Sequence, residues 1–384
     1  MAQLVASAVR TEDLSSWLEI DGAAFESNIR EVGSLLQDSA SVCAVIKSDA
    51  YGHGADLLMP ALVDSGVPYI GVGTNREAWI ARSHGYTGKL LRVRAAAPQE
   101  IAAALEYGIE ELVADPQSAW EISRIAAAAG RRLRVHLDIN SSGISRHSLD
   151  VSSALGRASA VAILSHPQLE PAGIMTHFPL DDVSHIEAGV ARFIEDATSI
   201  LRAANVPREQ VLLHAANSFA TLNVRSSWLD MVRIGALLYG DSDPRHPNYQ
   251  RCLAFKARIG SVNSYPAGSK IGYGHTHTLS VASRLATVTA GYGDGYRRAL
   301  GRGGNVLLRG SRMPVVDAIS MNSMVVDVSS LQDVRPGEEV VLFGRQGDAE
   351  ITSLELESAN RGILADLYTV WAKDSRILTS GANM

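Results

Sequence analysis

The chain up to Asp241 alternates short apolar runs with longer helical stretches, and this alternation restricts its fold more than any other feature. The runs, rich in Val, Ile and Leu, are Cys43–Lys47, Tyr69–Gly73, Leu90–Arg94, Glu111–Asp115, Leu133–Ile139, Ala172–Phe178, Val211–Asn217 and Met231–Gly235. Continuous runs of this kind are typical of parallel strands covered on both faces. Helical stretches such as Gln117–Ala129 and Val183–Ala204 lie between them. The alternation predicts a closed (β/α)8 TIM-like barrel, although a doubly wound open sheet would give the same pattern.

The sequence changes in character after Asp241. Residues 242–249, SDPRHPNY, are polar and contain proline, which is typical of a linker. The strand-like runs that follow are Ala254–Tyr265, Leu279–Tyr292, Asn305–Arg309, Val315–Val328 and Glu339–Phe343, and helical periodicity returns only near Ser353–Leu364. We therefore predict an α/β barrel over residues 1–247, whose N-terminal segment could instead join the second domain, and a mainly-β domain over residues 248–384.

Composition excludes several classes of protein. A hydrophobic fraction of 46% excludes a disordered chain, and a net charge of −6 argues against nucleic acid as a partner. Two cysteines, Cys43 and Cys252, exclude a disulfide scaffold and all but exclude a thiolate zinc site. The chain has no apolar run long enough to span a membrane, and the apolar stretch at its start is too short for a signal peptide. We expect a cytoplasmic location, or a periplasmic one if a leader has been removed.

The string AVIKSDAYGHG, Ala44 to Gly54, holds the first candidate catalytic residue. Lys47 lies at the C-terminal end of a predicted barrel strand, where barrel enzymes carry their catalytic groups. Its apolar neighbours favour a lowered amine pKa and nucleophilic attack on an aldehyde, although a single lysine at a strand end usually just reaches solvent. The whole string closely resembles the pyridoxal-phosphate lysine motif of the alanine racemase family, and further motifs extend the resemblance over nearly the whole chain.

Two of these motifs imply contacts with the ring of the cofactor. His177, in MTHF, resembles the family histidine that stacks on the ring, although by itself it could be an ordinary strand-end histidine. Arg233, in RIGALLYG, resembles the arginine that faces the pyridine nitrogen. Because arginine stays protonated, it disfavours a pyridinium, which restrains transamination and favours return of the proton to the α-carbon. A carboxylate at this position would instead indicate the decarboxylases of the same barrel class.

Another group of residues is implied to bind the cofactor's phosphate. Ser218, in ANSFATL, resembles the phosphate-binding serine of the family. The resemblance also points the backbone amides of Gly235 and Ala236 at the phosphate, a use of small residues that suits close approach of an anion. Tyr51 is implied to donate a hydrogen bond to the same phosphate. The expected cofactor is therefore pyridoxal 5'-phosphate, and no metal is expected.

The resemblance implies a two-base racemisation of a free amino acid. Tyr273, in IGYG, resembles the catalytic tyrosine, and the family dimer would bring it from a partner subunit to the face opposite Lys47. Inversion needs one base on each face of the substrate–cofactor adduct, yet the ordinary pKa of both side chains is about 10. Desolvation can lower the pKa of Lys47, and a nearby cation can lower that of Tyr273. Arg146, in NSSGISRH, resembles the arginine that contacts this tyrosine and the substrate.

The second domain carries two motifs implied to contact the substrate. Tyr292, in GYGDGYRRAL, resembles the tyrosine at the entrance of the site, although GYGDG alone would indicate a tight turn. Met321, in SMNSMVVDV, resembles the methionine whose amide holds the substrate carboxylate. Asn322 follows it, where alanine-specific enzymes usually have aspartate.

The string DINSSGISR, Asp138 to Arg146, bears on specificity. Alanine racemases commonly carry Lys-x-Asp-Thr-Gly-Met-x-Arg in this region, with the lysine carbamylated, whereas this chain has no lysine there. It is more similar to the Asn-Ser-Gly-Gly-Met-Ser-Arg stretch of the broad-spectrum amino-acid racemases, which implies that Asn140 contacts substrate. Whether an anion replaces the carbamate is left open by the sequence.

Further motifs agree with the broad-spectrum group. Arg92 and Arg94, in LRVR, and Tyr368, in ADLYTVW, are implied to contact substrate, although both arginines could be ordinary surface residues. Two positions depart from that group: Ser142 replaces a glycine and His147 replaces an asparagine. Cys43 occupies one half of a family disulfide, but the position expected for its partner is Tyr69, so that bridge is not expected here.

We therefore predict a racemase of broad or non-alanine specificity that acts on free amino acids as a homodimer. A housekeeping alanine racemase is the alternative, since it would share Lys47 and Tyr273. A non-catalytic pyridoxal-phosphate carrier is disfavoured because such carriers are expected to lack a domain like residues 250–384. A decarboxylase of the same fold type is disfavoured by Arg233.

Overall fold

The computed structural model describes residues 11–241, 245–275, 277–301, 303–372 and 375–379. Part of the predicted linker and the first ten residues, on which the leader prediction depended, lie outside the described residues. Two compact units are present. One comprises Glu26–Ala50 and Ala55–Gln250, and the other comprises the described residues up to Phe25, Tyr51–Gly54, and those from Arg251 onward.

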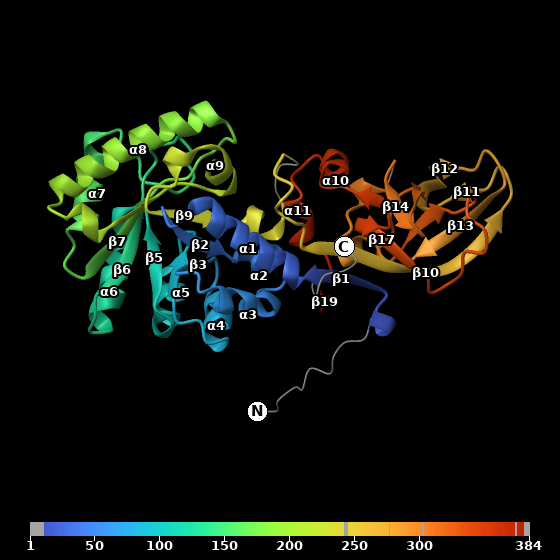
Figure 1. The fold of residues 1–384 in the computed structure, drawn as a ribbon, viewed down its shortest axis with the longest axis horizontal. Helices are drawn as coiled ribbons and strands as arrows, with labels where there is room; N and C mark the ends of the chain where they lie inside the picture. The colour runs from blue at the N-terminus through green and yellow to red at the C-terminus, as the bar shows by residue number, and fades with distance from the viewer. Residues whose placement is uncertain (1–10, 242–244, 276, 302, 373–374, 380–384) are drawn as a thin grey trace. The chain divides into compact units, whose positions relative to one another are not determined.

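The first unit is a parallel eight-stranded barrel (Figure 1). Its strands are β2 (Ser41–Val45), β3 (Tyr69–Val72), β4 (Lys89–Arg92), β5 (Ile109–Val113), β6 (Leu133–Asp138), β7 (Leu169–Met175), β8 (Leu212–His214) and β9 (Met231–Ile234). The order β8-β7-β6-β5-β4-β3-β2-β9 follows the chain except that the last strand pairs with the first. Backbone hydrogen bonds of 3.0 Å from Asp230 N to Leu213 O and from Arg233 N to Ala216 O then join the two edges.

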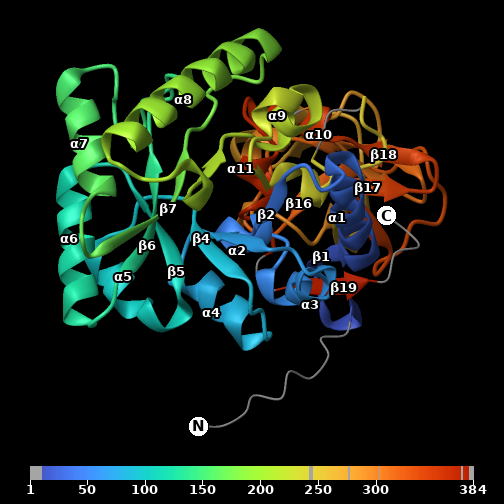
Figure 2. The same ribbon diagram turned by 60° about the vertical axis from the view of Figure 1, so that its left-hand side comes forward.

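This order excludes the open doubly wound sheet, whose strand order reverses at an internal switch point. Helices cover the strands from outside, as Figure 2 shows for α6 and α7. The helices of this part of the chain are α1 (Gly22–Leu36), α2 (Lys47–Tyr51), α3 (Ala55–Ser65), α4 (Asn75–Ser83), α5 (Pro98–Ala103), α6 (Pro116–Ala128), α7 (Ala154–Leu164), α8 (Val183–Ala203) and α9 (Ser218–Asn223). Because the strands are parallel, their C-terminal ends share one mouth, and that is where barrel enzymes place their chemistry.

The second unit is mainly β. Its strands are β1 (Ser16–Asp21), β10 (Leu253–Tyr265), β11 (Lys270–Ile271), β12 (His277–Thr278), β13 (Ser283–Val288), β14 (Asn305–Leu308), β15 (Ser311–Val316), β16 (Met324–Asp327), β17 (Glu339–Gln346), β18 (Ala349–Ile351) and β19 (Arg376–Thr379). Two short helices, α10 (Ser353–Asn360) and α11 (Ala365–Tyr368), follow β18. Strand β1 lies in this sheet between β10 and β19, so the N-terminal segment joins the β unit.

One expected strand of this unit was wrong. We predicted a single strand over Val315–Val328, but the structure has β15 and β16, which pair antiparallel with Val315 opposite Val326. The chain therefore reverses between them, and Asp317 takes a left-handed φ of 69° there. The reversal contains neither Gly nor Pro, the residues that usually announce a turn, so the flanking apolar residues looked like one strand.

A second expected strand, Leu279–Tyr292, is shorter in the structure, as β13. Tyr292 begins a 3-10 turn over Tyr292–Asp294 instead, in agreement with the tight-turn interpretation of GYGDG. Within the described parts of the chain, every helix falls short of the length or the apolar character that a bilayer span requires.

Candidate active site

Lys47 opens a short left-handed helical turn directly after β2. Residues 48–51 have φ between 52° and 58°, a region that costs a non-glycine residue roughly 1–2 kcal/mol each. Buried Glu77 fixes the turn, since Asp49 N donates to its Oε1 at 3.1 Å and Gly73 N donates to its Oε2 at 2.6 Å. Asp49 Oδ1 in turn accepts from Ala55 N at 2.9 Å. Backbone strain of this kind is typical of functional sites.

The amine of Lys47 has a lowered pKa. Desolvation is the largest cause, and the positive charges of Arg146 and Arg233 act in the same direction, while Glu77 opposes them. The residue as a whole remains exposed at the barrel mouth, so a ligand can reach it. Lowering the pKa enlarges the neutral, nucleophilic fraction of the amine at neutral pH.

Arg233, on β9, is buried and lies at one end of a chain of polar groups inside the barrel. Its Nη1 donates to Nδ1 of His214 at 2.8 Å, and His214 Nε2 lies 2.8 Å from Nδ1 of His136. His136 Nε2 is 2.7 Å from Oε2 of Glu110, whose Oε1 accepts from Arg134 at 2.6 Å. Arg233, His214, His136 and Glu110 are each at most 6% exposed, so this hydrogen-bonded network is closed to water.

The two ends of this network, Arg233 and Glu110, determine which imidazole nitrogens carry hydrogen. A guanidinium can only donate, so His214 Nδ1 accepts and its Nε2 carries the hydrogen. His136 Nδ1 must then accept, and its Nε2–H donates to the Glu110 carboxylate. Both imidazoles are therefore neutral, in agreement with their lowered pKa values, for which burial is the largest cause. A Cβ at Gly173 would come within 2.2 Å of His136 Nδ1, so glycine is required beside the ring.

His177 follows β7 and lies next to Arg233. Nη2 of Arg233 is 3.3 Å from its Nδ1. Burial, followed by the charges of Arg233, Arg146 and Lys47, lowers the pKa of His177 to about 3. The ring is therefore neutral at physiological pH, as suits stacking on a flat ligand.

Three hydrogen-bonding groups converge between β9 and α9. The Ser218 hydroxyl accepts from the amides of Gly235, at 3.3 Å, and Leu237, at 3.2 Å. Two amides and a hydroxyl gathered in this way form a cradle that suits an anion such as a phosphate. Ala236 was expected to supply one amide, but Leu237 is the second residue whose amide reaches Ser218.

Arg146 lies in the loop after β6, residues 139–149. Asn140 shapes this loop, because its Oδ1 accepts from Ser145 N and its Nδ2 donates to Ser145 Oγ, both at 3.0 Å. Ser142 ties the loop to β7 by donating to the His177 carbonyl, so the serine that departs from the broad-spectrum pattern holds the segment bearing His177. Arg146 itself is exposed.

Arg92 and Arg94 differ in their surroundings. Arg92 is fully buried, and Glu111 holds its guanidinium at 2.6 and 3.0 Å while Asn75 accepts from it at 2.9 Å. Its Nη1 has no hydrogen-bond partner among the described residues. Arg94 pairs with Glu100 and is partly exposed. A surface position is thus wrong for Arg92, while substrate binding stays a prediction for both.

The residues predicted in the second domain belong to the β unit. Tyr273 is 77% exposed, in a turn between β11 and β12, and Tyr292 and Met321 are also exposed. The backbone brings the last two together, since Gly293 N donates to Met321 O at 2.7 Å. Lys47 and Tyr273 therefore belong to different units, and their pairing stays a prediction.

Tyr368 is a buried residue of the same β unit. Its ring centroid lies 6.3 Å from that of Tyr51 and 5.6 Å from that of His53. A Cβ on Gly52, whose φ is 78°, would come within 2.1 Å of Tyr368 O, so only glycine fits there. The YGHG half of the lysine motif is thus packed against the ADLYTVW segment.

Cys43 is a free, buried thiol, and Cys252 is also buried. Cys43 pairs in register with Tyr69 across β2 and β3, so the side chain at the expected partner position is a tyrosine. Burial raises the pKa of the Cys43 thiol to about 12, so it is not a nucleophile at neutral pH.

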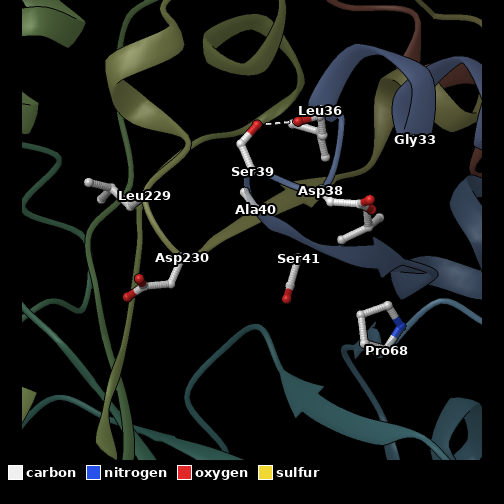
Figure 3. A pocket seen from close by; sticks show the side chains of 10 residues that line it. Gly33, Leu36, Asp38, Ser39, Ala40, Ser41, Pro68, Leu229 and Asp230 are labelled. Carbon is white, nitrogen blue, oxygen red and sulfur yellow. Dashed lines mark hydrogen bonds between the residues drawn. The ribbon is translucent and has the colours of Figure 1, made fainter. Parts of the chain in front are cut away.

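A pocket of about 430 Å³ lies at the other end of the barrel strands (Figure 3). It is lined by Ser41, which begins β2, and by Pro68 and Asp230, which precede β3 and β9. None of the predicted site residues lines it. The candidate chemistry therefore belongs to the C-terminal mouth.

Several charged or polar groups inside the barrel were not predicted from the sequence. Glu110, His136 and His214 lie in β5 (IEELV), β6 (LRVHLD) and β8 (LLH), and polar side chains at buried positions of these strands were the signal that could have indicated a network. Asp138 ends β6 and is 1% exposed. A charged residue at the C-terminal end of a barrel strand was the available signal.

Comparison with known proteins identifies one family along nearly the whole chain. Residues 20–243 match the family model described as alanine racemase, N-terminal domain, and residues 252–377 match that of the C-terminal domain. A broad specificity amino-acid racemase of Pseudomonas taetrolens is 51% identical over 367 residues, which cover 96% of this chain and 90% of that protein. A lysine racemase of Proteus mirabilis is 40% identical, with 95% and 89% covered. The solved structure of an alanine racemase from Streptomyces coelicolor A3(2) has a TM-score of 0.86 and 27% identity, with 96% and 99% covered.

Proposed function

Because the chain belongs to the alanine racemase family, it is an amino-acid racemase, and we propose that it interconverts the enantiomers of several free amino acids rather than of alanine alone. The observation that carries the activity is the convergence of Lys47, Arg233 and the Ser218 cradle at one barrel mouth. The lysine-free loop around Asn140 and the 51% identity to a broad specificity racemase support the specificity.

The residues at the mouth fit pyridoxal 5'-phosphate. Lys47 offers an amine of lowered pKa to an aldehyde, and Arg233 offers a buried guanidinium to a ring nitrogen. Ser218, with the amides of Gly235 and Leu237, would hold the phosphate, and Tyr51 and Ala236 remain proposed as further phosphate contacts. When bound, the cofactor supplies an electron sink for negative charge that develops at the α-carbon.

Lys47 and Tyr273 would act as the two bases. One side chain takes the α-proton from its face, and the other delivers a proton from the opposite face, so the centre inverts and no proton is consumed overall. The lowered pKa of Lys47 suits it to take a proton near neutral pH. Arg146 and the amide of Met321 are proposed to hold the substrate carboxylate, with Tyr292 at the entrance.

Arg233 would control which reaction occurs. Its guanidinium cannot accept a proton, and the neutral His214 behind it offers only a lone pair. Arg233 would therefore offer a ring nitrogen only a donor that keeps its own proton, which would limit delocalisation into the ring. Return of the proton to the α-carbon is favoured over transamination.

A homodimer would complete the site. Lys47 and Tyr273 lie in different compact units, and Tyr273 is 77% exposed, as expected for a side chain that enters a partner's site. Asn140, Arg92, Arg94 and Tyr368 are proposed to line the space around the substrate side chain. A cytoplasmic location also remains a proposal.

The test is a panel of L-amino acids followed by circular dichroism after loading with pyridoxal 5'-phosphate. We expect loss of optical activity with several of them, and activity with alanine only would contradict the broad specificity. Tyr273→Phe should slow at least one direction by roughly 10²-fold or more, because a positioned base is lost. Tyr265→Phe, at an exposed tyrosine of β10, is the matched control and should be unchanged. Lys47→Ala should abolish the visible absorbance of lysine-bound cofactor.

A further inference from the structure

Asp138 is a buried carboxylate for which the sequence resemblance gave no role. It ends β6 at the barrel mouth and is 1% exposed. Its oxygens receive no hydrogen bond of regular geometry from the described residues, and the side chain nitrogen beside it is His147 Nε2, which lies 2.9 Å from Oδ2. A buried charge supported so sparsely is costly, so its retention needs a reason beyond packing.

His147 connects this carboxylate to Arg146. Nε of Arg146 donates to His147 Nδ1 at 3.2 Å. Because the guanidinium can only donate, Nδ1 carries the lone pair and the hydrogen of the neutral ring is on Nε2, facing Asp138. The three residues form a carboxylate–imidazole–guanidinium series, which we call the Asp138 triad.

Backbone hydrogen bonds fix the base of the loop that carries Arg146 and His147. Asn140 N donates to Leu149 O, and Leu149 N donates to Asp138 O, both at 2.8 Å. The loop that carries Arg146 is therefore closed at its base beside the carboxylate. Asn140 also bonds to Ser145, directly before Arg146, and limits the positions the arginine can take.

The charges at the mouth explain why an anion is needed here. Lys47, Arg146 and Arg233 are close enough for both arginines to lower the pKa of Lys47 and for all three to lower that of His177. Asp138 acts in the opposite direction on Arg233, whose lowered pKa it partly raises. It is a buried negative charge among these cations.

We propose that the Asp138 triad is a built-in anion, which positions Arg146 and balances the cations of the mouth so that no added anion is required. Asp138 begins the nine-residue string DINSSGISR, and the carbamylated lysine begins the eight-residue string that alanine racemases have in this region, so the two strings start with these residues but differ in length by one. The carboxylate thus supplies the negative charge from the chain itself. This inference rests on the proposed racemase function, in which Arg146 faces substrate.

Chemical rescue tests the proposal in the cofactor-loaded enzyme. Asp138→Ala should lower the racemisation rate by about tenfold or more, because Arg146 loses its fixed position. Sodium formate, which returns the deleted carboxylate, should raise the rate of the Asp138→Ala variant several-fold, whereas neutral formamide should not. Wild type should respond to neither formate nor bicarbonate. Asp150→Ala, at an exposed aspartate of the same loop region, is the matched control and should behave like wild type.

A second measurement does not depend on turnover. In protein labelled with 15N-histidine, with or without cofactor, His147 should carry its hydrogen on Nε2, and Asp138→Asn should change that signal while the histidines of the Arg233 network keep theirs. Asp138→Asn also keeps the shape of the side chain, so it stands in if Asp138→Ala fails to fold. If no amino acid is racemised, the proposed function fails while the signal of His147 still tests the triad.

Three results would overturn the proposal. The first is a wild-type rate that rises with formate or bicarbonate. The second is an Asp138→Ala rate equal to that of wild type, or one that formate and formamide affect equally. The third is a His147 signal unchanged by Asp138→Asn.

Discussion

Arg233 and Arg146 are each followed by the same two kinds of group, an imidazole and a carboxylate, in very different surroundings. Each guanidinium donates to a neutral imidazole, and the series ends at a carboxylate, Glu110 in one case and Asp138 in the other. The Arg233 network runs between strands and is closed to water, whereas Arg146 lies on an exposed loop. The difference indicates that strands fix the residues proposed to hold the cofactor and that a loop positions the arginine proposed to hold the substrate.

Glu110→Ala should have the largest effect, because it breaks the buried network. It removes one partner of the half-exposed Arg134 and the buried acceptor of His136 Nε2–H, and leaving a buried donor without a partner costs about 1–3 kcal/mol. Thermal and denaturant unfolding would measure the loss of stability. Glu170→Ala is the matched control: Glu170 also pairs with Arg134, but at the surface, where a pair contributes about 0–1 kcal/mol. Equal losses for the two variants would contradict the distinction.

The second largest effect should come from acid, which should lower the free energy of unfolding. The pKa values of His136, His177 and His214 are lowered in the fold, so below about 6.5 the unfolded chain binds more protons than the folded one. The stability that these neutral histidines contribute is therefore fully present above that pH. It is lost as the pH falls towards their pKa values in the folded state, which for His177 is about 3. The slope is about 1.4 kcal/mol per pH unit for each such histidine.

Urea unfolding between pH 7 and 5 checks this prediction. His214→Gln should reduce the slope of the unfolding free energy against pH by the contribution of one histidine, about 1.4 kcal/mol per pH unit. A stability that is constant over this range, or that rises on acidification, would show that these imidazoles are not held neutral.

His147→Ala should have the smallest effect on stability, roughly 0.5–1 kcal/mol, because its ring is partly exposed on a loop. Its consequence should instead appear in substrate binding, as a raised KM with little change in Tm. A fall in Tm as large as that of Glu110→Ala would remove the contrast between the two arginines.

Particular residues show how far sequence reasoning reaches. The eight barrel strands were predicted because each is a mainly apolar run, and Lys47, Ser218 and Arg233 were proposed as site residues because contiguous motifs surround them. The β15–β16 reversal was missed because its turn contains neither Gly nor Pro. Leu237 was missed because a backbone amide leaves no trace in the side chain that carries it.

The sequence by itself determined the family, the barrel followed by a β domain, and the lysine that faces the mouth, because local patterns and contiguous strings encode them. Only the tertiary structure decided that Glu110, His136 and His214 stand in line behind Arg233, and that Asp138 and His147 stand behind Arg146. The first network comes from four strands that are far apart along the chain. Hydrogen bonds between such groups depend on strand register and on a donor meeting an acceptor, and neither is written in any single stretch of sequence.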